Sequence, residues 1–248
     1  NYYILLATIP DNYQKGVDTP RLLKEQKVDG LIVAGKVPAD LLEEISQSGL
    51  PFVLVDSQYE SYPAITIDNL NASIEAVRYL IEKGHDKIAF IGADPEHPSI
   101  SARIEGYQLM MMKKGYGYTS NLMFIDEEGL PTMQTGYAMA EQMMQSDVQP
   151  TAVFCANDAM ALGVLKYAEK QKIAIPDHLA VVGFDDVEGA SFSSPKLTTV
   201  RVFKEQLGEL ALRHLAGILN QDAAEDTKFK RSNHMLTVPA ELVVRDSA

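Results

Sequence analysis

The chain has 248 residues, 46% of them hydrophobic, which is enough to bury a sizeable core and fits one large domain or two of ordinary size. Its 22 basic and 34 acidic residues give a net charge of −12, opposite to the charge that phosphate neutralisation needs, which argues against nucleic-acid binding by this chain alone. The longest apolar runs, such as YYILLATI at the start, have the length of strands, so no segment is expected to span a bilayer.

The N-terminal composition and the cysteine content bear on the compartment. The N-terminus carries neither a basic segment nor an apolar core with a cleavage site, so no secretory signal is expected there. Cys155 is the single cysteine, which excludes a disulfide within the chain, and it lies in a predicted buried strand where a thiol is a small core residue. We therefore expect a soluble, cytoplasmic protein without membrane contact.

Strand-like runs alternate with helical runs along the chain. Strands are expected at residues 2–8, 29–35, 51–56, 64–68, 87–92, 121–126, 151–155, 179–186 and 197–202. Helices are expected at residues 19–26, 41–49, 69–83, 101–114, 136–144, 160–168 and 205–220. Residues 221–233 are polar and without apolar periodicity, which predicts an exposed loop, and the closing stretch predicts two extended pieces around Pro239. This alternation predicts an α/β fold with parallel sheets covered by helices on both faces.

Common enzyme signatures are absent from the sequence. There is no G-x-x-x-x-G-K-[ST] loop, no G-x-G-x-x-G after a strand and no G-x-S-x-G elbow. The five histidines are scattered without metal-ligand spacing. We expect neither an enzyme nor a cofactor or metal requirement.

Polar residues follow several of the predicted buried strands. Asp56 ends PFVLVD, Asn157 follows TAVFC, and Asp185 and Asp186 end LAVVGFDD, while Arg103 lies in a helix shortly after KIAFIG. Ligands of open α/β sheets bind beyond the carboxyl ends of the strands, and this set of planar donors and acceptors suits vicinal hydroxyls or a small anion.

Each of these polar residues also has a purely structural interpretation. Asp56 opens a turn, Asn157 or Asp158 caps the helix that follows, Asp186 caps a short helix, and Arg103 lies on the surface. A hydrolase that uses Asp56 and Asp185 as acid and base is a further alternative, and nothing in the sequence fixes their separation.

Several motifs in order along the chain resemble the LacI/GalR family of bacterial transcription regulators. They are VDGLIVAG, PFVLVD, IDN at residues 67–69, GHDKIAFIG, SARIEGY, PTAVFCANDAMALGVL, IPDHLAVVGFDD, SPKLTTVR and VPAELVVRDS. The resemblance runs from about residue 29 to residue 246 and concerns the effector-binding core, whose fold is shared with periplasmic sugar-binding proteins.

The resemblance implies two Rossmann-like lobes with parallel sheets and a ligand cleft between them, of the periplasmic-binding-protein type I kind. The first lobe would hold residues 1–93 plus 203–231, and the second residues 94–202 plus 232–248. Matched to the family motifs, the effector-binding residues would be Asp56, Arg103, Asn157 and Asp185, with Asp158 capping the helix. The effector would be a sugar or a sugar derivative.

The resemblance also implies binding partners, and at some positions the sequence differs from the family pattern. Operator DNA would be bound only through an N-terminal helix-turn-helix, which this chain lacks, and the family's first core strand and helix are missing as well. A homodimer is expected, with contacts from residues 163–170 and 189–194. A stand-alone sugar-binding protein of a transporter remains an alternative. Leu130 and Pro131 stand where relatives often carry an aromatic ring, with Phe184, Phe192 and Phe203 as candidate replacements.

Overall fold

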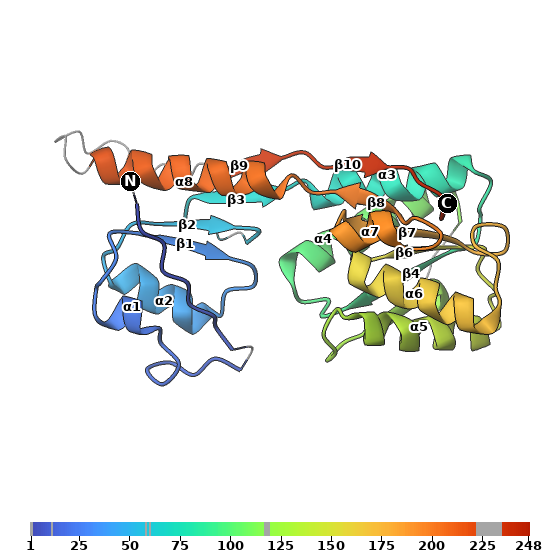
Figure 1. Ribbon diagram of the computed structural model, residues 1–248, viewed down its shortest axis with the longest axis horizontal. Coiled ribbons are helices and arrows are strands. Elements are labelled where there is room, and N and C mark those ends of the chain that lie inside the picture. Colours follow the sequence, from blue (N-terminus) through green and yellow to red (C-terminus); the bar gives the residue numbers. More distant parts are fainter. Residues whose placement is uncertain (1, 11, 58, 60, 117–119, 222–234) are drawn as a thin grey trace. The chain divides into compact units, whose positions relative to one another are not determined.

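The computed structural model describes residues 2–10, 12–57, 59, 61–116, 120–221 and 235–248 (Figure 1). It has an α/β fold with two separate sheets of mainly parallel strands, as the sequence predicts. The chain divides into two compact units: unit 1 contains Asn1–Thr66 and Lys204–Val238, and unit 2 contains Ile67–Phe203 and Pro239–Ala248. No helix in the described part of the chain is long and apolar enough to cross a membrane.

Unit 1 is built on a four-stranded sheet with the order β1-β2-β3-β9, in which β1, β2 and β3 run parallel. The strands are β1 (Leu31–Ala34), β2 (Phe52–Val55), β3 (Ala64–Ile67) and β9 (Met235–Val238). The helices are α1 (Arg21–Lys24), α2 (Ala39–Gln47) and α8 (Lys204–Gln221). Figure 1 shows α1 and α2 on one face of this sheet and α8 on the other.

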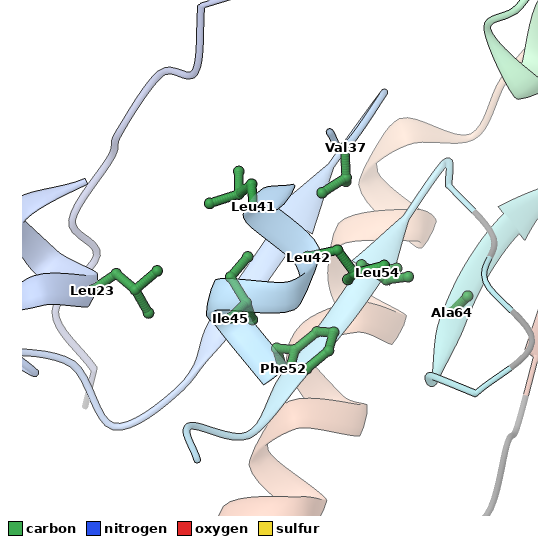
Figure 2. Packing of buried hydrophobic residues seen from close by; sticks show 8 residues of the cluster. All are labelled: Leu23, Val37, Leu41, Leu42, Ile45, Phe52, Leu54 and Ala64. Atoms are coloured by element: carbon green, nitrogen blue, oxygen red, sulfur yellow. The ribbon is translucent and has the colours of Figure 1, made fainter. Parts of the chain in front are cut away.

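The core of unit 1 forms between α2 and the sheet. Leu41, Leu42 and Ile45 lie on one side of α2 because residues three and four positions apart share a helix face. Leu42 and Ile45 lie beside Leu54 and Phe52 of β2 (Figure 2), and Leu41 belongs to the same buried cluster. This burial is what fixes α2 on the sheet, since a helix this short is marginal by itself.

The strand predicted at residues 2–8 is wrong. These residues form neither helix nor strand, and Tyr3, Ile4 and Leu6 are 100%, 88% and 90% exposed. The composition of the run favours a strand, but β-propensity describes the fit to a pleated, half-buried surface. No described strand pairs with this segment, so its backbone makes no inter-strand hydrogen bonds with the described sheets.

Unit 2 is built on a six-stranded sheet with the order β10-β8-β7-β6-β4-β5, parallel except for β10. The strands are β4 (Ile88–Ala93), β5 (Met123–Asp126), β6 (Ala152–Cys155), β7 (Ala180–Asp185), β8 (Thr198–Arg201) and β10 (Glu241–Val243). The helices are α3 (Asn69–Glu82), α4 (Pro98–Lys113), η1 (Ser120–Leu122), α5 (Met133–Gln145), α6 (Asp158–Gln171) and α7 (Glu188–Phe192).

Helices cover both faces of the sheet of unit 2. The chain moves from β4 outward to β5 and then returns across β4 to β6 and β7. Right-handed crossovers therefore place α4 on one face and α5 and α6 on the other. α5 and α6 approach closely at Gly163, where a Cβ atom would lie 2.2 Å from the carbonyl oxygen of Met133.

The reversal of strand order has a consequence for the site. The loops that follow β4 and β6 leave the sheet toward opposite faces, so the carboxyl ends of these two neighbouring strands form a topological switch point, where open α/β sheets bind ligands. Both strands are fully buried, so their side chains belong to the core and only the residues after them are available to a ligand.

The last residues of the chain tie two strands together. The Ser247 hydroxyl donates to the Val181 carbonyl at 2.6 Å and accepts from the Thr198 amide at 2.8 Å. Ser247 is fully buried, so both bonds are shielded from water. The two extended pieces expected around Pro239 are present as β9 and β10.

The compact units differ from the lobes expected from the sequence. Residues 67–93 belong to unit 2, because β4 pairs with β5 and β6, and residues 235–238 belong to unit 1, because β9 joins its sheet. The remaining helices and strands lie within a few residues of the predicted ranges. The loop expected at residues 221–233 lies, apart from its first residue, outside the described residues.

Candidate functional site

Arg103 is at the centre of the candidate site. It projects from α4, the helix that follows β4, and its side chain is only 5% exposed. The guanidinium donates from Nη1 to the Ala156 carbonyl at 2.6 Å and from Nε to Asn69 Oδ1 at 2.9 Å. The carbonyl of Ala156 lies just beyond the end of β6, so Arg103, on the helix after β4, connects the two strands of the switch point. The interpretation of Arg103 as a surface residue is wrong.

The end of β7 supplies two further contacts to Arg103. The Phe184 ring lies under the guanidinium, with its centroid 3.7 Å from Cζ, and is fully buried. Asp185 Oδ1 lies 3.5 Å from Nη2, and its side chain is 29% exposed. The guanidinium of Arg103 is therefore contacted on one face by Phe184 and along its edge by hydrogen-bond and ion-pair partners. Asp185 is more accessible to solvent than Phe184. Phe184 is not exposed for stacking on a sugar.

Asn69 was not recognised from the sequence as a site residue. Its neighbour Asp68 caps α3, since the Asp68 carboxylate accepts from the Asn71 amide at 3.2 Å. Asn69 is 7% exposed and directs its side-chain oxygen to Arg103. Because Asp68 alone is enough to cap the helix, the adjacent Asn69 is left over for another contact, and this is the only sequence signal for its role.

The helix cap expected at Asp158 is made by Asn157 instead. Asn157 is the N-cap of α6, since its Oδ1 accepts from the Met160 amide at 2.9 Å, while its Nδ2 donates to the Pro131 carbonyl at 3.0 Å. Asp158 does not cap the helix and is fully buried. An amide can accept and donate at once, so Asn157 can both cap the helix and fix the loop that precedes α5.

Asp186, beside the site, belongs to an ion-pair network. Its carboxylate accepts from Arg201 Nε at 2.7 Å and from Arg245 Nη2 at 2.6 Å. Burial raises the pKa of Asp186, but the hydrogen bonds from Arg245 and Arg201 outweigh it and hold the pKa below its usual value. Asp186 does not cap α7, whose N-cap is Val187.

Carboxylates line the ends of the neighbouring strands. Asp94 follows β4 and Asp126 ends β5, and the Asp94 amide donates to the Asp126 carbonyl at 3.1 Å. Both side chains are partly exposed, and the exposed Glu127 and Glu128 come next in the chain. With Asp185, this edge of the sheet carries more negative than positive side chains.

The backbone at these strand ends adopts a conformation that side chains disfavour. Asp185 has φ 110° and Asp186 has φ 49°, both in the region where glycine is usual. Asp94 has φ 47° and, in unit 1, Asp56 has φ 55°. Strained backbone persists where surrounding contacts over-determine it, and it gathers at functional sites.

Three of the four predicted site residues, Arg103, Asn157 and Asp185, lie at the carboxyl edge of one sheet in unit 2. Asp56 belongs to unit 1, where it follows β2. The acid–base pair considered from the sequence, Asp56 with Asp185, is thus divided between two units.

The described residues were expected to hold neither a metal site nor a reactive thiol. Among them, no group of three or more histidine, cysteine, aspartate or glutamate residues is arranged to hold a metal ion. Cys155 is fully buried, as expected, and burial together with the Asp158 charge raises the pKa of its thiol far above the usual value.

Comparison with known proteins agrees with this architecture. Residues 77–248 match the family described as periplasmic binding protein-like domain. The chain is 30% identical to catabolite control protein A of Priestia megaterium, over 91% of this chain and 68% of the relative. It is 34% identical to the HTH-type transcriptional repressor PurR of Vibrio atlanticus, over 86% of this chain and 64% of the relative. The chain thus spans about two thirds of the length of these relatives.

A solved structure of a transcriptional regulator has a similar fold. The transcriptional regulator CelR in complex with cellobiose is similar with a TM-score of 0.84 and 26% sequence identity, over 94% of this chain and 71% of that protein. The PurR relative and this neighbour are regulators of transcription by name.

Proposed function

Because this chain belongs to the LacI/GalR family of transcriptional regulators and contains its periplasmic-binding-protein-like core, we propose that it senses a small neutral sugar or sugar derivative and thereby modulates DNA binding. The relatives named above are a control protein and a repressor rather than enzymes. The residues proposed to bind the effector are Arg103, Asn157 and Asp185. Asp56 in unit 1 stays a prediction of the sequence resemblance.

The observation that carries the proposal is the arrangement of Arg103 at the topological switch point. Its guanidinium is fixed by Asn69, the Ala156 carbonyl and the Phe184 ring before any ligand arrives. The guanidinium is a rigid, planar donor, and the partly exposed carboxylate of Asp185 beside it is an acceptor. Adjacent hydroxyl groups of a sugar match such a pair, and pre-organisation lowers the entropic cost of binding.

The charge at the site favours a neutral ligand over a phosphorylated one. Arg103 is already paired with Asp185, and Asp94 and Asp126 follow the next strands. A phosphate would bring two negative charges toward these carboxylates, and like charges at short range are repulsive in partly buried surroundings. A neutral or amino-substituted sugar avoids this repulsion.

Regulation would follow from differential affinity. An effector shifts a conformational equilibrium only by the difference between its affinities for the two states, typically about 1–3 kcal/mol in allosteric proteins. We infer that the shift acts on operator DNA through a helix-turn-helix outside this chain and through a second subunit, in the cytoplasm where the operator lies. The names of the relatives, which include an HTH-type repressor, support this inference.

The proposal is tested by a thermal-shift screen against neutral sugars, sugar phosphates and purines. A ligand at a hundredfold excess over its Kd stabilises the native state by about 2.7 kcal/mol. For a chain of this size that raises the Tm by roughly 5–10 °C. A neutral sugar should give such a shift, and its phosphate ester a much smaller one.

Two variants connect the shift with the site. Arg103→Gln should abolish the shift, because the planar donor beside Asp185 is lost. Arg78→Gln is the matched control, since Arg78 is a partly exposed arginine of α3 whose described ion-pair partner is Glu75. A shift that survives in Arg103→Gln, or a cooperative transition that no sugar displaces, would refute the proposed function.

A further inference from the structure

Asp158 is a fully buried carboxylate whose hydrogen bonds go to residues other than those proposed to bind the effector. It lies in the first turn of α6, and its Oδ2 accepts from the Val187 amide at 2.8 Å. Its Oδ1 accepts from the Thr199 hydroxyl at 2.5 Å. The carboxylate therefore links α6 to the turn after β7 and to β8.

The carboxylate of Asp158 packs so closely against β7 that no side chain fits at Gly183. A Cβ atom at Gly183 would lie 2.2 Å from Asp158 Oδ1 and 3.0 Å from Leu197 Cδ2. Gly183 lies in the middle of β7, where the lack of a side chain lets the carboxylate approach the strand. The close approach of Asp158 to β7 thus depends on glycine at position 183.

The turn that Asp158 holds is the one that presents Asp185. Asp185 and Asp186 are consecutive residues with positive φ, and Val187 comes directly after them. Such a strained turn needs contacts that hold it. Asp186 is held by Arg201 and Arg245, whereas the amide after the turn is held by Asp158.

We propose that Asp158 is a positioning residue of the candidate site: through the Val187 amide and the Thr199 hydroxyl it holds the strained Asp185–Val187 turn, which keeps Asp185 beside Arg103. Asp158 then determines ligand affinity without contacting the ligand. This second statement rests on the proposed function, whereas the first concerns the free protein alone.

The charges that face Asp158 make its protonation state relevant near neutral pH. Burial raises the pKa of Asp158 to about 7 against the lowering effect of the bonds from Thr199 and Val187, and the carboxylates of Asp185 and Asp186 raise it further. The Cys155 thiol of β6 is the other titratable neighbour and stays protonated, since burial raises its pKa.

The free protein is tested by amide hydrogen exchange of residues 185–187, measured by NMR. Asp158→Ala removes both contacts and should speed exchange of the Val187 amide at least tenfold. Asp158→Asn should stay within threefold of the wild type, because an amide oxygen can accept from Val187 while the amide nitrogen donates to Thr199. Thr199→Val, which removes one contact only, provides an intermediate case if Asp158→Ala does not fold.

Ser247→Ala is the matched control. Ser247 is a buried side chain that also hydrogen-bonds to β7 and to the first residue of β8, through Val181 and Thr198. Its loss should speed exchange at Thr198 and leave Val187 unchanged. Equal exchange of Val187 in Asp158→Ala and the wild type, or an equal rise in Ser247→Ala, would overturn the positioning role.

The ligand part is tested with cellobiose and ribose as probes, by calorimetric titration of the same variants. For a sugar that binds the wild type, the Kd should rise at least tenfold in Asp158→Ala and less than threefold in Asp158→Asn and Ser247→Ala. An unchanged Kd in a variant with a loosened turn would refute the link to affinity. Absence of binding to the wild type would count against the proposed function, while the exchange result would still decide the positioning role.

Discussion

Replacing Asp158 by asparagine should remove a pH dependence of the stability of the protein. Burial raises the pKa of this carboxyl from 3.8 to about 7 in the folded state, although the bonds from Thr199 and Val187 oppose it. Between these values the folded protein holds a proton that the unfolded chain has lost. The free energy of unfolding therefore falls as the pH rises from about 4 to about 7, and remains low above that range.

The size of the effect follows from the pKa difference. A difference of about 3 corresponds to about 4 kcal/mol. Asparagine has nearly the same volume and cannot ionise, and it can keep both hydrogen bonds of Asp158. Relative to the wild type, Asp158→Asn should thus gain up to about 4 kcal/mol between pH 4 and pH 8.

Urea unfolding followed by circular dichroism at pH 4, 5, 6, 7 and 8 measures this difference for both proteins. Ser247→Ala serves as the control, because Ser247 does not titrate and its difference from the wild type should not depend on pH. A difference between Asp158→Asn and the wild type that stays constant across this range would refute the reasoning about the buried carboxylate.

Two other variants test the packing and the ion pairs of unit 2. Gly163→Ala places a methyl group against the Met133 carbonyl and should lower the free energy of unfolding by at least about 2 kcal/mol, measured by urea denaturation; a neutral result would show that α5 and α6 separate easily. Arg245→Gln removes one partner of the nearly buried Asp186, with Arg201 remaining, and should cost about 2 kcal/mol at pH 7. Because the folded-state pKa of Asp186 is lowered, its pairing stabilises the protein above its unfolded pKa and is lost as the pH falls through the folded value, so this cost should shrink toward pH 2. A cost that is the same at pH 7 and at pH 2 would contradict the ion-pair account.

The fold could be predicted largely because buried parallel strands are continuous apolar runs. KIAFIG, TAVFC and LAVVGFDD became β4, β6 and β7, and the residues after them lie at the predicted edge. The same rule failed for residues 2–8, because an apolar run becomes a strand only where another strand accepts its hydrogen bonds.

The site could be predicted as a set of positions but not as a set of contacts. The position of Arg103 followed from the strand that precedes its helix. Its partner Asn69 lies 34 residues away in the chain, and nothing local to either residue indicates the contact. The capping of α6 by Asn157 rather than by Asp158 has the same origin, since both are good N-caps and only the long-range bonds of Asp158 to Thr199 and Val187 decide between them.

The most direct test of the account is isothermal titration calorimetry at pH 7.5 with the neutral sugar that gives the largest thermal shift and with its phosphate ester. The account predicts that the neutral sugar binds the wild type, that the phosphate ester binds at least tenfold more weakly, and that Arg103→Gln abolishes binding of both while Arg78→Gln does not. Tighter binding of the phosphate ester, or unchanged binding to Arg103→Gln, would contradict the claim that a neutral sugar is recognised by Arg103 and Asp185.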